Sequence, residues 1–144
     1  MQAPNNHKHK GLIVAGMHSS GGKTAVTCLL LAALRQRNLA VQPFKVGPDY
    51  IDPGFHFHFS AKASVNLDPW IMGREHVVHA AEQFTGNSFG IAEGVMGLFD
   101  GSDPTNDSGS TMEVARWLGW PILLVVPCRN VGRSITAAIQ GFVA

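Results

Sequence analysis

The sequence GMHSSGGKT, residues 16–24, contains the clearest structural signal in this chain. It connects a short apolar run at residues 11–16 to a segment at residues 23–37 whose apolar side chains recur at helical spacing. Glycines allow backbone N–H groups to close around phosphate oxygens, and the first turn of a helix adds a partial positive charge. We therefore predict a phosphate-binding loop at a strand–helix junction, formed by Gly16, Ser19, Ser20, Gly21, Gly22, Lys23 and Thr24.

The end of this loop predicts a nucleotide and a magnesium ion as ligands. Lys23 can reach the β- and γ-phosphates, and the Thr24 hydroxyl can ligate Mg²⁺. The spacing is longer than the standard one, because five residues rather than four separate Gly16 from Gly22. Partition-type ATPases carry a second lysine at the position of His18, which argues against an ATPase that dimerises through that lysine. A glycine-rich turn that binds nothing is the alternative, and the flanking strand and helix argue against it.

Apolar runs and helical segments alternate along the rest of the chain. They predict strands at residues 41–46, 89–95 and 121–126 and helices at residues 74–84, 110–118 and 134–143. Pro43 argues against a central position for the strand that contains it. The alternation is typical of an α/β fold with a doubly wound, mostly parallel sheet, here of the P-loop NTPase type. Because four strands make a narrow sheet of this kind, we expect an incomplete domain.

Composition and charge narrow the class of protein. The 144 residues correspond to one domain, and 45% hydrophobic against 15% charged residues supports a packed core. The net charge of +1 indicates no basic face, so nucleic acid is not an expected partner. No apolar stretch approaches the roughly 18–20 residues that span a bilayer, and two cysteines fit a reducing compartment. We therefore expect a cytoplasmic protein without a membrane partner, with a disordered tail at residues 1–10.

Two segments rich in glycine and proline gather acidic residues. Residues 47–66 predict an irregular loop with four aromatic rings, and residues 96–109 predict a second, polar loop. Between them, Asp68 and Pro69 have the residue types of an N-cap and a first helical position. Acidic residues gathered in these loops or just before them favour cation binding or substrate handling, and they are Asp49, Asp52, Glu93, Asp100, Asp103 and Asp107.

Five stretches closely resemble the cobyrinic acid a,c-diamide synthase family. In the family's order, they are GMHSSGGKT at residues 16–24, FKVGPDYIDPGFH at residues 44–56, NLD at residues 66–68, EGVMGLFDG at residues 93–101 and GST at residues 109–111. The resemblance runs from about Gly11 to the C-terminus, and the five-residue loop spacing is shared with the related dethiobiotin synthetase fold. Residues 11–144 thus look like the N-terminal part of an ATP-dependent amide synthetase domain, without the family's glutaminase domain.

The resemblance implies a glutamine-hydrolysing ligase of cobalamin biosynthesis. The family amidates the a and c acetate carboxylates of a corrin, cobyrinic acid, through an acyl phosphate, with ATP, Mg²⁺ and ammonia from glutamine. A glutaminase domain or subunit is the implied partner, and this chain alone is expected to hold only the phosphate end of ATP and part of the tetrapyrrole. Sister enzymes act on nickel sirohydrochlorin or sirohaem-type rings, which stay open as substrates. A nucleotide-binding switch without ligase activity is the alternative from another class.

The resemblance and the chemistry together select the residues of the reaction centre. Thr24, Asp49 and Glu93 are the candidate Mg²⁺ ligands, because Mg²⁺ prefers hard oxygen ligands and binds with few carboxylates. Glu93 also ends a strand at the edge of the sheet where parallel folds bind ligands. Lys45 would join Lys23 in neutralising charge around the γ-phosphate.

The remaining candidates face the substrate. Asp52 and Asp100 would orient the substrate carboxylate or ammonia. Asp52 and Asp49 each adjoin a proline, so both can instead shape a turn. The roles of Arg129 and Arg133, after the last strand, stay open. The residues that could line the flat apolar face of a tetrapyrrole are Tyr50, Ile51, Phe55 and His56.

Overall fold

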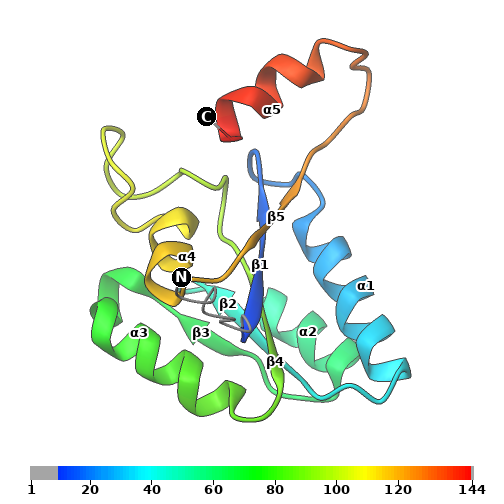
Figure 1. Cartoon of the computed structure of the whole chain (residues 1–144), viewed down its shortest axis with the longest axis vertical. Coiled ribbons are helices and arrows are strands. Elements are labelled where there is room, and N and C mark those ends of the chain that lie inside the picture. The colour runs from blue at the N-terminus through cyan, green and yellow to red at the C-terminus, as the bar shows by residue number, and fades with distance from the viewer. Residues whose placement is uncertain (1–9, 144) are drawn as a thin grey trace, which may run out of the picture.

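The computed structural model describes residues 10–143, so nearly all of the expected tail lies outside the described part of the chain. These residues form one parallel sheet with helices on both faces (Figure 1). The strands are β1 (Gly11–Gly16), β2 (Val41–Val46), β3 (Val65–Leu67), β4 (Phe89–Glu93) and β5 (Ile122–Val125). The helices are α1 (Lys23–Gln36), α2 (Asp52–Ser60), α3 (Pro69–Thr85), α4 (Thr111–Leu118) and α5 (Ile135–Val143).

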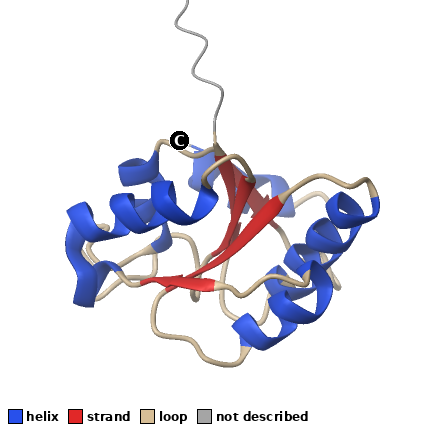
Figure 2. Cartoon of the chain, turned by 90° about the horizontal axis from the view of Figure 1, so that it is seen from below, coloured by secondary structure: helices blue, strands red, loops and turns tan. Residues whose placement is uncertain are grey.

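The strand order is β3-β2-β4-β1-β5, and every neighbouring pair is parallel. Helices α1 and α2 pack together on one face of the sheet, and α3 and α4 pack together on the other (Figures 1 and 2). The predicted α/β fold is therefore confirmed. The carboxyl ends of β1, β2 and β4, which are neighbours in the sheet, all point toward the loop that follows β1.

The segment at residues 47–66 differs from its expected irregular conformation. It contains helix α2 and the short strand β3, so the described sheet has five strands rather than four. Helix α2 begins with Asp52 and Pro53. The same two residue types, Asp68 and Pro69, stand at the start of α3. Only three residues long, β3 owes its regularity to pairing with β2, an interaction that its own sequence does not reveal.

Helix α3 begins earlier than its periodicity predicts. It starts at Pro69, and the Asp68 side chain accepts hydrogen bonds from the backbone N–H groups of Trp70 and Ile71, which confirms the predicted N-cap. Gly73 has φ 68° and ψ 172° and breaks the helix into two parts. The expected start at residue 74 is therefore the start of its second part.

Strand β2 is central, so the expectation drawn from Pro43 is wrong. Strand β2 lies between β3 and β4, with Pro43 opposite Ile91 of β4. Pairing with β3 begins only at Phe44, one residue later. On that side the sheet edge is open at Pro43, which is where a residue without a backbone N–H is tolerated.

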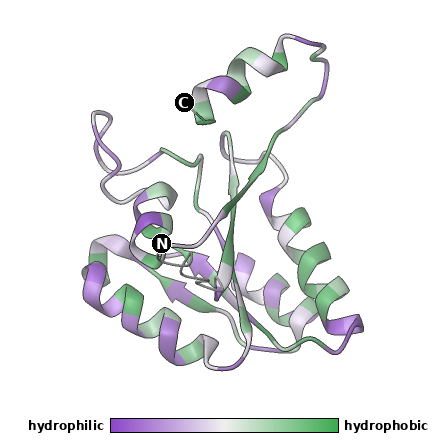
Figure 3. Cartoon of the chain, in the orientation of Figure 1, coloured by the Kyte–Doolittle hydropathy of each residue, from purple (hydrophilic) through white to green (hydrophobic). Residues whose placement is uncertain are grey.

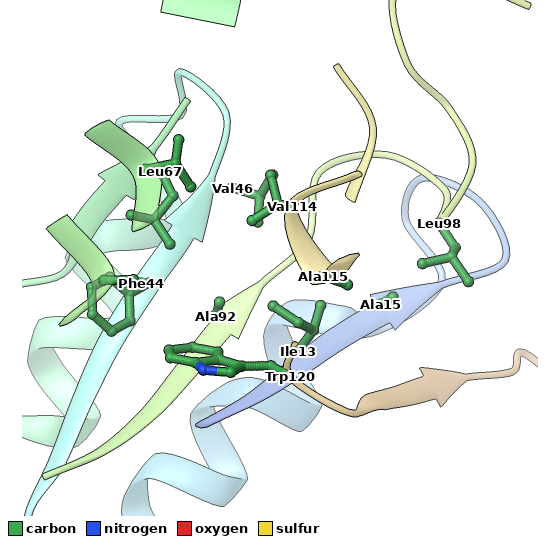
Figure 4. Close-up of a cluster of buried hydrophobic side chains, with 12 residues drawn as sticks. Ile13, Ala15, Phe44, Val46, Leu67, Ala92, Leu98, Val114, Ala115 and Trp120 are labelled. Atoms are coloured by element: carbon green, nitrogen blue, oxygen red, sulfur yellow. The ribbon is translucent and has the colours of Figure 1, made fainter. Parts of the chain in front are cut away.

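Trp120 closes the core on the α3–α4 face of the sheet. Its ring packs edge-on to Phe44 at a centroid distance of 5.8 Å, within the buried cluster drawn in Figure 4. The ring also covers Gly11 and Gly90, which face each other across β1 and β4. A Cβ atom at Gly90 would overlap the Trp120 ring, so this close approach requires glycine.

Helix α5 projects beyond the sheet at the end of β5 (Figure 1). Its Phe142 packs against Phe99 at a ring-centroid distance of 5.4 Å, and the described part of the helix buries none of its residues. Hydropathy colouring shows apolar residues along β1 and polar residues in the loop that precedes α4 (Figure 3). No helix among residues 10–143 has the length and apolar character needed to cross a membrane.

Candidate nucleotide and metal site

A cavity of about 450 Å³ opens at the carboxyl edge of the sheet. It lies between the loop after β1 and the residues that follow β2 and β4. This is the edge at which parallel sheets bind ligands. The structure brings nearly all of the predicted reaction-centre residues to its wall, which is formed by Ser19, Ser20, Gly22, Lys23, Thr24, Lys45, Asp49, Asp52, Glu93, Val95 and Met96.

The loop after β1 has the backbone shape of an anion cradle. Gly22, immediately before α1, has φ 97°, and Ser20 has φ 59°. Among residues 10–143, the backbone N–H groups of Ser20, Gly21 and Gly22 donate to no protein acceptor. A Cβ atom at Gly16 would lie 3.0 Å from Cγ of Lys23, so the lysine stem occupies the space left by the missing side chain. These free donors at a helix N-terminus fit the phosphates of a nucleotide.

Lys23 folds back over this loop. Its Nζ donates to the backbone carbonyl of His18 at 3.1 Å, and the residue is only 6% exposed. Burial, together with the positive charge of Lys45, lowers the pKa of the Lys23 ammonium. Two cations held close together on the wall of one cavity form a natural site for a polyanion.

Lys45 is the centre of a buried ionic cluster. Its Nζ lies 2.5 Å from Oδ2 of Asp52, 3.4 Å from Oε1 of Glu93 and 3.5 Å from Oδ2 of Asp49. It also donates to the carbonyl oxygen of Gly94 at 3.2 Å. Burial alone would lower the pKa of Lys45, but the charges of Glu93 and Asp52 outweigh it and raise that pKa. One cation therefore partly neutralises three carboxylates, and the excess negative charge favours a further cation.

Glu93 is the most buried of these acids. Its Oε1 accepts from the Thr24 hydroxyl at 2.6 Å, and its Oε2 lies 2.6 Å from Nε2 of His56. Burial alone would raise the pKa of Glu93, but the His56 hydrogen bond and the Lys45 charge hold it below its usual value. An ionised carboxylate beside the Thr24 hydroxyl in the first turn of α1 supplies hard oxygen atoms of the kind that Mg²⁺ prefers.

Asp49 and Asp52 behave differently although they are close in the chain. Asp49 accepts hydrogen bonds from the backbone N–H groups of Ile51 and Asp52, which oppose its burial and lower its pKa. Burial and the charge of Glu93 raise the pKa of Asp52 despite its contact with Lys45. Asp49 thus shapes the turn into α2 and also lines the cavity.

The oxygen atoms of Thr24, Asp49, Asp52 and Glu93 fit a magnesium site in which water completes the coordination. The described residues contain no preformed cluster of three or more His, Cys, Asp or Glu side chains able to hold a metal ion by themselves. Mg²⁺ does not require one, since it keeps several waters and binds through one or two carboxylates and the phosphates of its nucleotide.

The expected substrate-facing residues separate into two groups. Tyr50, Ile51 and Phe55 are exposed, with Tyr50 88% exposed, and none of the three lines the cavity. His56 is 0% exposed and cannot line an open apolar face, so the expectation for it is wrong. Helix α2 turns its imidazole inward, because Glu93 and Ser64 provide polar partners for both ring nitrogens.

Asp100 lies in the loop after β4 and does not belong to the cavity wall. Its Oδ2 accepts from the backbone N–H of Gly97 at 2.8 Å and so shapes the turn beside the phosphate loop. Arg129 and Arg133 are exposed between β5 and α5, and among residues 10–143 no side-chain hydrogen bond or ion pair assigns them a role.

Two residues that position the site are not among the candidates predicted from the sequence. Asn66 donates to the carbonyl oxygens of Gly47 and Asp49 and thereby holds the turn after β2. Thr111 hydrogen-bonds to both the N–H and the carbonyl of Val95, just after Glu93. Both residues lie in the distinctive NLD and GST strings, which were the available signal.

Together, the parallel sheet and the loop with free N–H donors define an α/β nucleotide-binding domain. The family model described as the CobQ/CobB/MinD/ParA nucleotide binding domain matches residues 12–136, and the chain belongs to this family.

Several curated relatives are similar in sequence to this chain over most of its length. The chain is 47% identical over 132 residues to a cobyrinate a,c-diamide synthase of Syntrophotalea carbinolica, covering 91% of this chain and 29% of the relative. It is 47% identical over 135 residues to a hydrogenobyrinate a,c-diamide synthase of Rhodobacter capsulatus, covering 92% and 31%. A cobyrinate a,c-diamide synthase of Thermoplasma volcanium is 43% identical over 132 residues, covering 91% and 29%. The chain thus spans less than a third of the length of these relatives.

Proposed function

We propose that this chain is the nucleotide-binding part of an enzyme that amidates the a and c acetate carboxylates of cobyrinic acid in cobalamin biosynthesis. The observation that carries the proposal is the contact of Thr24 with Glu93 beside Lys45 and Asp52. It joins the phosphate loop to an acidic cluster at a single cavity. The names of the relatives supply the class of substrate.

The chemistry requires activation of the substrate carboxylate, because oxide is a very poor leaving group. A carboxylate oxygen attacks the γ-phosphorus of ATP, and the bond to ADP breaks. Ammonia then attacks the acyl carbon, and phosphate leaves with that carboxylate oxygen. Lys23 and Lys45 offset the charge that accumulates on the γ-phosphoryl oxygens. Mg²⁺, when bound, would neutralise the β- and γ-phosphates, with Thr24, Glu93 and Asp49 as the residues that hold it.

The exposed apolar residues after β2 suit the flat face of a tetrapyrrole. Tyr50 and Ile51 lie between Asp49 and Asp52 in the chain, and Phe55 follows on α2, so a ring stacked on them would bring a peripheral carboxylate toward the cavity. Asp52 lines the cavity and contacts Lys45, and from there it can orient the incoming ammonia. A nucleotide-dependent switch has no need of such a surface, which favours the ligase over that alternative.

Ammonia and the rest of the nucleotide site must come from elsewhere in the enzyme. We propose that residues 11–144 are the N-terminal part of the synthetase domain, and that a glutaminase domain or subunit releases ammonia from glutamine. The small share of each relative that the chain covers supports this. ATP and glutamine are cytoplasmic metabolites, so the reaction belongs in the cytoplasm.

A cobalt-free ring is the second candidate substrate. The hydrogenobyrinate a,c-diamide synthase relative is as similar to this chain, at 47% identity, as a cobyrinate relative is. The central metal is part of the substrate, so the residues of this cavity do not select it.

The test uses the complete protein that carries this chain, mixed with ATP, Mg²⁺, glutamine or ammonia, and a panel of tetrapyrrole carboxylates. ADP release and product mass are followed together. The proposal expects OH to be replaced by NH₂ on cobyrinate or hydrogenobyrinate, with one ADP formed for each amide. ATP binding without modification of any ring would instead favour the switch.

A further inference from the structure

We propose that His56 is a positioning residue that fixes the orientation of the Glu93 carboxylate toward Thr24 and the bound metal–nucleotide complex. This inference rests on the proposed role of Glu93 at the nucleotide site. His56 and Glu93 are 37 positions apart in the chain.

A continuous hydrogen-bonded chain runs from α2 to the phosphate loop. Ser64 Oγ lies 3.0 Å from Nδ1 of His56, and Nε2 of His56 lies 2.6 Å from Oε2 of Glu93. The other carboxylate oxygen, Oε1, accepts from Thr24 Oγ1 at 2.6 Å. Because a carboxylate oxygen only accepts, Nε2 carries the proton, and in the neutral ring Nδ1 accepts from the Ser64 hydroxyl.

Burial makes this orientation specific. His56 is 0% exposed and Glu93 is 0% exposed, so water cannot replace a missing partner at either residue. The His56 ring is held at its other end by Ser64 and by its place on α2, whose Ser60 hydroxyl donates to the His56 carbonyl. A ring fixed on both sides fixes the carboxylate that it contacts.

The competing partner of Glu93 is Lys45. Its Nζ already lies 3.4 Å from Oε1, the oxygen atom that also contacts Thr24. Without the donor at His56, the carboxylate is free to rotate and to pair with Lys45 through both oxygens. His56 engages Oε2 and so keeps Oε1 directed to the Thr24 side of the cavity, where the metal ion is expected.

The test measures binding rather than turnover. Mn²⁺ serves as a paramagnetic substitute for Mg²⁺, and its affinity in the presence of ATP is followed by electron paramagnetic resonance in the complete protein. ATP affinity is measured separately in excess EDTA. Loss of a positioning partner of a metal ligand typically weakens metal binding by about 10–100-fold. We expect such a loss in His56→Leu, with ATP affinity in EDTA unchanged.

Two matched variants test the donor itself. His56→Gln places an amide N–H near the position of Nε2 and is expected to restore Mn²⁺ affinity to within a few-fold of wild type. His56→Asn reaches only toward the position of Nδ1 and is expected to behave like His56→Leu. This pair decides the question even if His56→Leu does not fold.

A double-mutant cycle tests whether His56 acts through Glu93. In a Glu93→Gln background, His56→Asn is expected to cause no further loss of Mn²⁺ affinity. The proposal is overturned if His56→Asn binds Mn²⁺ as wild type does, if it weakens ATP binding in EDTA equally, or if its effect persists in the Glu93→Gln background. No ring substrate takes part in these measurements, so a failure of the proposed amidation leaves their outcome readable.

Discussion

The hydroxyl of Thr24 lies 2.6 Å from a carboxylate oxygen of Glu93, although 69 positions separate the two residues. Thr24 is the second residue of α1, just after the phosphate loop, and Glu93 is the last residue of β4. Strands β1 and β4 are neighbours in register, with Val14 opposite Glu93. The parallel sheet therefore brings a phosphate-binding hydroxyl and a buried acid to the same point, which is the geometric basis of the predictions below.

Lys23→Ala should abolish nucleotide turnover and leave the fold intact. The side chain is a preorganised cation over the phosphate loop, and loss of one such group typically lowers kcat by about 10²–10³-fold. Steady-state ADP release measures the effect, and circular dichroism checks the fold. Lys62→Ala is the matched control, because Lys62 is an exposed lysine away from the cavity. Full turnover in Lys23→Ala would contradict the assignment of the loop.

Glu93→Gln should weaken the Mg²⁺ dependence of turnover. The amide keeps the shape of the side chain but removes the negative charge that holds a cation beside Thr24. We expect the Mg²⁺ concentration at half-maximal rate to rise by at least about tenfold, in line with a lost metal ligand interaction. An unchanged Mg²⁺ requirement would show that the ligand set is wrong.

The same residue predicts a pH dependence of stability in the metal-free protein. The pKa of Glu93 is lowered from 4.5 in the folded state, so the unfolded chain takes up its proton first as the pH falls. The stabilisation from Glu93 is therefore complete above 4.5 and is lost as the pH falls toward the folded pKa. In urea unfolding at pH values on either side of 4.5, the free energy of unfolding should fall less with decreasing pH in Glu93→Gln than in wild type.

The pKa of Asp52 is shifted in the opposite direction, so this residue provides a control for that experiment. Its pKa is raised from 3.8 in the folded state, so the folded chain takes up this proton first and gains stability as the pH falls. In Asp52→Asn, the free energy of unfolding should therefore fall more steeply with decreasing pH than in wild type. Identical pH profiles for wild type and both variants would contradict the charge balance around Lys45.

Tyr50→Ala should raise KM for the tetrapyrrole and leave KM for ATP unchanged. The ring of Tyr50 is 88% exposed, so its removal costs little stability but removes apolar contact area. Loss of base- or ring-stacking contacts of this size corresponds to about 1 kcal/mol, or roughly a fivefold change. Phe84→Ala, at the far end of α3, is the matched control with a partly exposed aromatic ring. Equal effects of the two variants on KM for the tetrapyrrole would contradict a role of Tyr50 in binding the ring.

Gly90→Ala should destabilise the fold by about 1–3 kcal/mol, the usual range for overpacking. The added methyl group would overlap the Trp120 ring, which lies flat against β1 and β4. Chemical denaturation measures the change in unfolding free energy. Gly54→Ala is the control, because a Cβ atom there meets nothing within 4 Å and α2 is a helix that alanine favours. A neutral Gly90→Ala would show that Trp120 packs elsewhere.

The sequence predicts best where the signal is local. The β1–loop–α1 unit follows from glycine spacing, an apolar run and helical periodicity, all within residues 11–37. Strand β3 was missed because its regularity depends on pairing with the distant β2, whereas α2 begins at a local Asp-Pro pair that the sequence offered. Burial decides the rest, since a histidine beside aromatic residues gives no sign of which way α2 turns it.

The ionic cluster shows the same division. The acidic strings identify Asp49, Asp52 and Glu93 as members of one site, and the cavity contains all three. Their sharing of one lysine, with pKa values moved in different directions, depends on distances of a few ångströms that the sequence does not encode locally.

The most direct test of carboxylate activation at this cavity follows an oxygen atom. A tetrapyrrole with oxygen-18 in its acetate carboxylates is amidated by the complete protein with ATP and ammonia, and the released inorganic phosphate is analysed by mass spectrometry. Transfer through an acyl phosphate predicts one oxygen-18 atom in each phosphate, in step with amide formation, and none with Lys23→Ala. Amide formed together with unlabelled phosphate would contradict the account.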